Sequence, residues 1–373
     1  MSSRQALERF SRADPELARL RDRALVMLGR SAGGDPVDID VERSLEGPTD
    51  VVLTCRRGLE DVLGEELATA GVGRETARGP GRVELDYRGP LRPLFERRVA
   101  LDVGLRVRLH ESRSLEAALL ASLEESAPLL ARLSTGIPRF RLAFRGRGAK
   151  KATQFRLARA LDPDRLVNAP RGAPIEAVVD ERTREVIFYL RPSRELRFAY
   201  RGRDVPAASH PSIAAALARV AGVEADDVVW DPFVGSGLEL CERGLLGPFR
   251  RLVGSDLSER ALGAARVNLE RAGLRAELVR ADARTLTPAG VTLIVTNPPM
   301  GRRIARDRDL GALVDAAIDH FARVLLPGGR LVWLSPLPAR SASRIASAGL
   351  ALERIGRVDL GGFDAELQRA RKR

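Results

Sequence analysis

The sequence has very little cysteine and histidine, and this scarcity excludes several kinds of site. Its 373 residues include two cysteines, Cys55 and Cys241, which lie far apart and outside any C-x-x-C pair. The three histidines, His110, His210 and His320, are isolated from one another and have no neighbour that suggests a nucleophile or a metal ligand. Neither a disulfide framework nor a zinc site is therefore indicated. We expect no metal and a reducing, cytoplasmic setting.

Long apolar runs are also absent. The longest run near the N-terminus is Ala24–Leu28, which is far shorter than the core of a signal peptide and shorter still than a membrane span. We therefore expect a soluble protein without a targeting segment and without a membrane partner.

Acidic residues are outnumbered by basic ones. Lysine and arginine total 62 against 50 aspartates and glutamates, which gives a formal net charge of +12. Only three of the basic residues are lysines, as a coding bias toward arginine would produce, so the position of the charge is more informative than its total. The stretch Arg132–Arg171 holds eleven basic residues and two acids, a net charge of +9. This stretch favours a polyanionic partner.

The pattern along the chain predicts five segments. Residues 1–49 are interpreted as an N-terminal helical arm and linker because glycine and proline follow a polar, arginine-rich helical stretch. Two compact α+β units follow, and their strands are expected at 51–55, 82–87, 103–109, 139–144, 175–179 and 186–190. The resulting boundaries are 1–49, 50–111, 112–192, a linker at 193–203, and 204–373.

The last segment alternates strictly between strand and helix patterns, which indicates an α/β fold with a doubly wound parallel sheet. Its parallel strands are expected at 228–232, 252–256, 276–280, 293–296 and 330–334. A closing antiparallel pair is expected at 354–358 and 363–370, joined through Gly361 and Gly362. Such an appended hairpin is typical of methyltransferase sheets and absent from most dinucleotide-binding ones.

A glycine-rich turn follows the first of these strands, where residues 231–237 read D-P-F-V-G-S-G. Ligands of open α/β sheets bind beyond the carboxyl ends of the strands, and glycines there let a ligand approach the backbone closely. We expect Gly235 and Gly237 to lie against the amino-acid end of a cofactor. An ordinary glycine-rich turn is the alternative interpretation.

Acidic residues end the next two strands. Asp256 stands about twenty residues after the glycine turn, a position suited to binding both hydroxyls of a ribose, as in NAD enzymes. Asp282 is placed to bind an adenine edge, although a solvated acid at a strand end fits it equally well.

Residues 297–301, N-P-P-M-G, directly follow the fourth strand. Two prolines fix the backbone and remove two donors, so the Asn297 side-chain oxygen and the Pro298 carbonyl can both act as acceptors. This pair suits an exocyclic amine, whose lone pair would then be turned toward a methyl donor. Positioning and electrostatics would supply most of the catalysis, and no general base is needed before attack.

With these motifs the chain resembles the THUMP-domain RNA guanine-N2 methyltransferases. The match in the second half rests on residues 231–237, Asp256, Asp282 and the Asn-Pro-Pro turn. In the front half, residues 54–60, T-C-R-R-G-L-E, resemble the opening of the family's ferredoxin-like domain, and residues 112–192 resemble its THUMP domain. The resemblance implies a Rossmann-like class I methyltransferase domain, S-adenosylmethionine as cofactor, and a structured RNA, tRNA or rRNA, as partner.

The resemblance also implies roles for individual residues. The catalytic candidates are Asn297, Pro298, Pro299 and Met300. The cofactor-binding candidates are Asp231, Phe233, Gly235, Ser236, Gly237, Asp256, Leu257, Asp282 and Ala283. The RNA-binding candidates are Arg139, Arg141, Arg145, Arg147, Lys150, Lys151, Arg156, Arg302 and Arg303, for which a solvated basic face is the alternative.

The chain departs from the family pattern at Met300, where relatives usually carry an aromatic residue that stacks on the flipped base. Methionine can cover a ring through its sulfur. Val234 and Leu238 replace the usual cysteine and threonine and are interpreted as packing changes. The alternatives are an RNA-binding protein with a degenerate catalytic site and an N-methyltransferase acting on adenine N6 or protein glutamine. An NAD dehydrogenase would leave the Asn-Pro-Pro turn unexplained.

Overall fold

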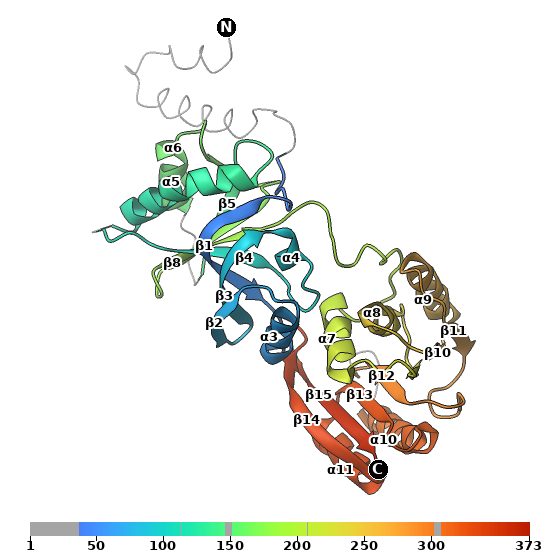
Figure 1. The fold of residues 1–373 in the computed structure, drawn as a ribbon. Coiled ribbons are helices and arrows are strands. Elements are labelled where there is room, and N and C mark those ends of the chain that lie inside the picture. Colours follow the sequence, from blue (N-terminus) through green and yellow to red (C-terminus); the bar gives the residue numbers. More distant parts are fainter. Residues whose placement is uncertain (1–36, 113, 146–150, 207, 302–306) are drawn as a thin grey trace, which may run out of the picture.

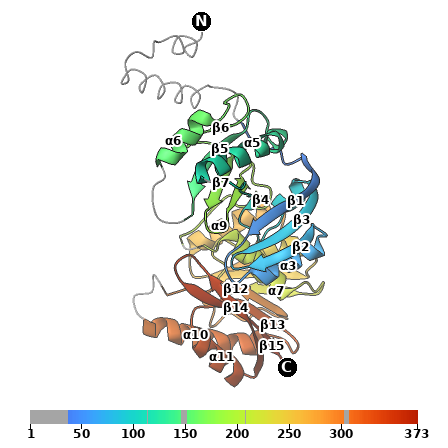
Figure 2. The same cartoon turned by 90° about the vertical axis from the view of Figure 1, so that its left-hand side faces the viewer.

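The chain folds around two separate β-sheets (Figure 1). The structure is a computed structural model, and it describes residues 37–112, 114–145, 151–206, 208–301 and 307–373. Seen from the side, the unit built on the first sheet lies above the unit built on the second (Figure 2).

The first sheet has eight strands in the order β2-β3-β1-β4-β8-β7-β5-β6. Helices α3 and α4 accompany its first strands, and α5 and α6 its later ones. The elements are β1 (Ser44–Thr54), α3 (Glu60–Thr69), β2 (Arg74–Gly79), β3 (Arg82–Pro90), α4 (Arg92–Phe95), β4 (Val103–Arg108), α5 (Leu115–Leu133), β5 (Arg139–Phe144), α6 (Lys151–Ala160), β6 (Val167–Asn168), β7 (Ile175–Asp180) and β8 (Glu185–Leu190).

The two α+β units expected from the sequence share this one sheet. Strand β4 of the first pairs antiparallel with β8 of the second, from Val103 opposite Leu190 to Arg108 opposite Glu185. A sequence pattern shows where strands lie but not which strands pair across a proposed boundary. The division at residue 111 therefore remains a prediction, drawn within a continuous sheet.

The end of the expected linker, residues 37–49, is part of the first unit. Strand β1 begins at Ser44, Ile39 is buried, and Asp38 accepts hydrogen bonds from the backbone of Ile39 and of Ser193. The structure differs here from the sequence-based expectation because a few tertiary contacts fix a segment that shows no regular apolar pattern of its own. Residues 1–36 lie outside the described residues.

The second sheet has seven strands in the order β11-β10-β9-β12-β13-β15-β14. Five are parallel, and β15 is antiparallel to both of its neighbours. The elements are α7 (Pro211–Ala221), β9 (Val228–Asp231), α8 (Leu238–Leu246), β10 (Arg251–Asp256), α9 (Glu259–Arg271), β11 (Glu277–Arg280), β12 (Leu293–Thr296), α10 (Asp307–Val324), β13 (Arg330–Ser335), α11 (Pro338–Ser347), β14 (Leu350–Asp359) and β15 (Asp364–Lys372).

This order confirms the Rossmann-like class I methyltransferase fold, including its antiparallel hairpin. Strands β9 and β12 are adjacent, and the chain runs outward from them in opposite directions. Open α/β sheets bind ligands at the carboxyl ends of strands at such a switch point, and this position is called the crevice below. Helices α7, α8 and α9 follow one another on one face, and α10 packs against α11 on the other (Figure 1). Trp230 and Phe321 meet edge to face in the core, with ring centroids 5.6 Å apart.

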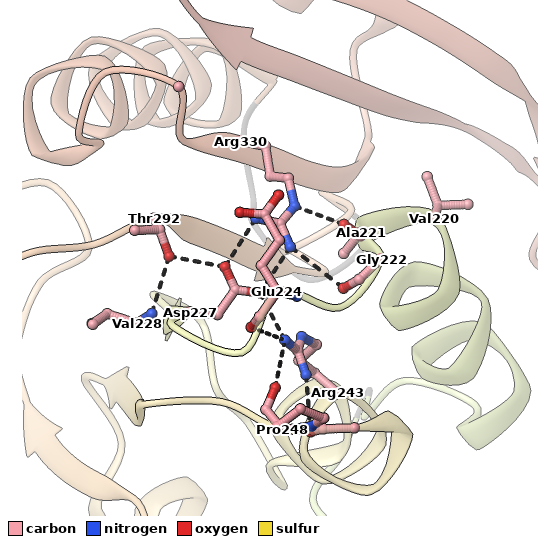
Figure 3. A network of polar contacts seen from close by, with 12 residues as sticks. Val220, Ala221, Gly222, Glu224, Asp227, Val228, Arg243, Pro248, Thr292 and Arg330 are labelled. Atoms are coloured by element: carbon pink, nitrogen blue, oxygen red, sulfur yellow. Dashed lines mark hydrogen bonds and ion pairs between the residues drawn. The ribbon is translucent and has the colours of Figure 1, made fainter.

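A buried ionic network joins the amino ends of three strands (Figure 3). Asp227, just before β9, contacts Arg330 of β13 at 2.8 Å and Arg243 of α8 at 2.7 Å. Thr292, just before β12, donates to the same carboxylate at 2.9 Å. Burial opposes ionisation of Asp227, but the two arginines outweigh it and lower its pKa. The network links these strands at their amino ends, whereas the crevice lies at their carboxyl ends.

The two units meet through specific contacts. Arg98 of the first unit pairs with Glu242 of α8 at 2.6 Å, and Glu66 of α3 pairs with Arg219 of α7 at 2.8 Å. Gly58 packs so closely on β14 that a Cβ there would lie 1.8 Å from the carbonyl oxygen of Arg357. Only a glycine fits this junction, where φ is +91°.

Candidate active site

Asp231 is the last residue of β9, at the carboxyl end of the strand beside β12. One carboxylate oxygen, Oδ1, accepts hydrogen bonds from Thr296 of β12 at 2.6 Å and from the Phe233 amide at 3.1 Å. The other, Oδ2, is buried and has no partner among the described residues. Burial raises the pKa of Asp231 well above its usual value, and the neighbouring Glu239 raises it further. A cationic group entering the crevice would relieve both effects.

The glycine-rich turn lies beside this carboxylate. Gly235 and Gly237 both have positive φ, +51° and +79°, and a Cβ on Gly237 would lie 3.1 Å from the Cβ of Ala265 in α9. The turn therefore needs glycine both for its backbone conformation and for its packing. Ser236 is buried, and Phe233 is half-buried against the core under α10.

Asp256 ends β10 beside the turn. Its carboxylate accepts hydrogen bonds from the amides of Gly235 at 3.1 Å and Ser258 at 2.9 Å. Each oxygen keeps a further acceptor position, so the side chain is already oriented and can still receive a pair of hydroxyl groups. The next residue, Leu257, is 63% exposed and leaves an apolar side chain open to a planar ring.

Asp282, after β11, is held by its own neighbour. Arg284 donates to it from the backbone and from the guanidinium, at 2.9 Å each, and this contact lowers the pKa of Asp282 to about 2. The sequence analysis did not anticipate this pair. Ala283 beside it is buried.

The Asn-Pro-Pro turn follows β12 at the same edge of the sheet. The Asn297 Nδ2 donates to the Ser209 hydroxyl at 2.8 Å, whereas Oδ1 is buried and has no partner among the described residues. Pro298 is buried, Pro299 is exposed, and Met300 is half-buried against the main core cluster. An acceptor without a donor is costly in a folded protein unless a ligand supplies the donor.

Three further residues support the crevice, and the sequence analysis did not single them out. Ser209 precedes α7 and donates to the buried carboxylate of Glu239 in α8. Asn268 of α9 donates to Ser236 and accepts from the amides of Gly202 and Arg203, so it ties the glycine-rich turn to the segment that joins the two units. No local pattern marks such residues, because their roles come from contacts between distant segments.

The RNA-binding candidates in the first unit are mostly paired. Arg141 pairs with Glu176, Arg145 with Asp180 and Arg156 with Glu116. Their side chains nevertheless stay 47–56% exposed, so their guanidinium groups remain in reach of a ligand. Arg139 begins β5, and Lys151 begins α6. Arg147, Lys150, Arg302 and Arg303 lie outside the described residues.

The described residues contain neither a cluster of metal-ligand side chains nor a helix that could span a membrane. Within those residues, no histidine, cysteine or acid cluster of three or more could hold a metal ion. Both cysteines are buried and free, and burial raises the pKa of the Cys55 thiol to about 12. Among the same residues, no helix has the length and apolarity that crossing a membrane requires.

Comparison with known proteins finds a methyltransferase domain model and relatives that are named as RNA guanine-N2 methyltransferases. Residues 199–362 match the family model described as RMKL-like, methyltransferase domain. The tRNA (guanine(6)-N2)-methyltransferase of Thermus thermophilus is 31% identical over 331 residues, which cover 83% of this chain and 95% of that protein. The U6 snRNA (guanine-N(2))-methyltransferase THUMPD2 of Bos taurus is 32% identical over 127 residues, 33% of this chain and 25% of that protein.

A solved structure extends the similarity to both units. The crystal structure of TrmN from Thermus thermophilus superposes with a TM-score of 0.71 at 27% identity, and the match covers 87% of this chain and 100% of that chain. The sheet order, the glycine-rich turn, the Asn-Pro-Pro turn and this full-length similarity agree with one another. The chain therefore belongs to the THUMP-domain RNA guanine-N2 methyltransferases, enzymes that use S-adenosylmethionine as the methyl donor.

Proposed function

We propose that this enzyme methylates the exocyclic N2 amine of a guanosine in tRNA, and that Asn297 and Pro298 hold the amine. The observation that carries the proposal is the buried Oδ1 of Asn297, which has no hydrogen-bond partner among the described residues and lies at the carboxyl end of β12. Guanine N2 carries two hydrogens, and the Asn297 oxygen together with the Pro298 carbonyl can accept both. Holding them directs the nitrogen lone pair away from these acceptors, toward the middle of the crevice.

The other crevice residues fit the cofactor. The unpartnered Oδ2 of Asp231 suits the cofactor ammonium group, Asp256 suits the ribose hydroxyls, and exposed Leu257 suits one face of adenine. Gly235 and Gly237 leave room for the amino-acid end. When bound there, S-adenosylmethionine supplies a methyl group made electrophilic by its sulfonium charge. Asp282 is the weaker candidate for adenine, since Arg284 already occupies its carboxylate.

Met300 is proposed to cover the flipped base. It continues the rigid turn directly after Pro299 and stays half-buried against the core, so its position is fixed by packing. Its sulfur and side-chain carbons provide a polarizable surface for a ring. An aromatic residue would offer a larger surface, so we expect Met300 to contribute less binding energy to the base than an aromatic would.

The first unit is proposed to bind the RNA and present the guanosine to the crevice, with the ferredoxin-like part at 50–111 and the THUMP part at 112–192. The basic stretch within it supports this role, because arginine contacts to phosphates provide affinity and orientation without reading the sequence. The direct ion pairs between the two units support a fixed spacing between the RNA-binding surface and the crevice. The two buried, free cysteines agree with action in the reducing cytoplasm.

The test is methylation in vitro followed by nucleoside mass spectrometry. The purified enzyme is incubated with S-adenosylmethionine carrying a labelled methyl group and with tRNA from a strain lacking the gene. We expect the label in N2-methylguanosine after digestion. Label in N6-methyladenosine, or label only in protein, would show that the acceptor has been assigned wrongly.

A further inference from the structure

The Asn297 amide nitrogen is held by two successive hydrogen bonds, which run through Ser209 to Glu239. Its Nδ2 donates to the Ser209 hydroxyl at 2.8 Å, and the Ser209 hydroxyl in turn donates to Glu239 Oε1. The three residues come from separate segments: the turn after β12, the loop before α7 and the first turn of α8.

We propose that Ser209 and Glu239 are positioning residues that determine which end of the Asn297 amide faces the crevice. The inference rests on the proposed function, in which the amide oxygen accepts a hydrogen from the guanine amine. Ser209 and Glu239 would keep that oxygen, and not the amide nitrogen, directed at the substrate.

The direction of these two hydrogen bonds is set by the single proton of the Ser209 hydroxyl. A serine hydroxyl has one hydrogen to donate and two lone pairs. Because Ser209 donates its hydrogen to Glu239, it can only accept from Asn297. The amide must then place its nitrogen toward Ser209 and its oxygen toward the crevice, as observed.

If Ser209 did not donate to Glu239, the Asn297 amide could rotate so that its nitrogen and oxygen exchange positions. The last torsion of an asparagine side chain is broad and roughly two-fold, so both orientations fit the same space. A hydroxyl free of Glu239 could donate to Oδ1, and the amide would then present two N–H donors to the crevice. Donors facing an amine hydrogen repel it, so the base would lose its acceptor.

The charge on Glu239 determines whether the Ser209 hydroxyl must donate its hydrogen to Glu239. Its carboxyl is buried, and burial raises its pKa to about 7 although the Ser209 hydrogen bond opposes the rise. The groups that face it are Asp231 at the end of β9, and Cys241 and Glu242 of its own helix. An ionised Glu239 can only accept, so Ser209 must donate its hydrogen to it. A protonated Glu239 can donate to Ser209 instead, and the Ser209 hydrogen is then free to bond to Asn297. Competence for transfer should therefore increase as the pH rises through the pKa of Glu239.

The first experiment measures single-turnover methyl transfer at saturating RNA and cofactor. Ser209→Ala should lower the rate about tenfold or more, as expected for a misplaced reacting group, without weakening cofactor binding measured by calorimetry. Ser209→Thr keeps the hydroxyl and should restore most of the rate. Ser126→Ala is the control, because the Ser126 hydroxyl likewise donates one hydrogen bond, to the Ser122 carbonyl within α5 of the first unit. Wild-type turnover by Ser209→Ala would overturn the inference.

The second experiment records the pH profile of the same rate between about pH 6 and pH 8. The native enzyme should gain activity across this interval, and Glu239→Gln, which cannot ionise, should lose that part of the pH dependence. A pH profile unchanged by the substitution would overturn the inference. This measurement decides the matter even if Ser209→Ala fails to fold.

Asn297→Ala separates this inference from the proposed function. If Asn297→Ala transfers methyl groups at the native rate, the proposed mechanism fails and the positioning role fails with it. If Asn297→Ala is inactive while Ser209→Ala and Glu239→Gln behave like the native enzyme, only the positioning role is wrong.

Discussion

At the scale of single residues, Asn297 is the side chain that we propose to hold the reacting amine. Asn297→Ala removes the buried acceptor and leaves the glycine turn and Asp256 in place. Loss of one preorganised polar contact to a reacting group typically costs about 10²–10³ in turnover. We therefore expect kcat to fall by about that factor while the dissociation constant for S-adenosylmethionine, measured by calorimetry, stays within about twofold. A variant with native kcat would rule out the acceptor role.

Asp256 should show the opposite behaviour. Asp256→Ala removes the proposed ribose contact and also releases the amide of Gly235. A hydrogen bond to a charged group contributes about 1.5–3 kcal/mol, so loss of even one ribose contact should lower cofactor affinity roughly tenfold to a hundredfold. Asp226→Ala is the control, since Asp226 is exposed at the opposite edge of the sheet. Equal affinities in the two variants would place the ribose elsewhere.

Single residues also show which parts of the candidate site could be predicted from the sequence. The positions of Asn297, Asp256 and the two glycines could be predicted because each belongs to a short motif at the carboxyl end of an apolar strand. Ser209, Glu239 and Asn268 could not, since their partners are 30–88 residues away in the chain and only the tertiary fold brings them together. The Arg284 partner of Asp282 is only two residues away, but nothing in a strand-end pattern shows that an arginine will turn back onto the acid.

At the scale of elements, the parallel strands of the second sheet agree with their predicted positions to within one residue at each end, because continuous apolar runs bounded by polar residues mark buried strands. Strand β2 escaped prediction because its sequence, R-E-T-A-R-G, is nearly all exposed and has no apolar alternation. It lies at the edge of its sheet, where charged residues are common. Strand β14 begins four residues earlier than expected for the same reason, since its first half is mostly exposed.

The network around Asp227 gives a prediction for the strands that it joins. Asp227→Ala would leave the buried Arg243 guanidinium without its counter-charge and would remove the acidic partner that lies 2.8 Å from Arg330. Breaking a buried pair in this way typically costs about 3–5 kcal/mol. We expect the free energy of unfolding, measured by urea titration, to drop by about that amount. The affinity of the folded fraction for S-adenosylmethionine should stay native, because the network lies at the other end of the strands.

A loss below about 1 kcal/mol would show that the arginines find other partners. Glu224 is the nearest candidate, since it already lies 3.3 Å from Arg330.

At the scale of the whole molecule, the first unit is proposed to bind RNA through its basic stretch. Replacing Arg145, Arg147 and Lys150 together by alanine should weaken tRNA binding and reduce the slope of log K against log salt concentration by about 2, given about 0.7 per lost phosphate contact. Filter binding over a series of salt concentrations measures both quantities. The matched control removes three arginines of the second unit, Arg266, Arg275 and Arg323. Equal slopes in the two triple variants would show that the RNA binds elsewhere.

The arrangement of the whole molecule was the part least accessible from the sequence. The order of the segments could be predicted, but the single sheet shared by the two front units depends on the pairing of β4 with β8. The contact of Gly58 with Arg357 joins residues about three hundred positions apart, and a lone glycine before a helix gives no sign of it.

The central claim is that this crevice transfers a methyl group to the N2 amine of guanosine in RNA. Its most direct test uses two tRNA transcripts that differ at one position: the mapped target guanosine is kept in one and replaced by inosine, which lacks only the 2-amino group, in the other. We predict native methyl transfer to the first and none to the second, with similar affinity for both. Methylation of the inosine transcript at the same position would contradict the account.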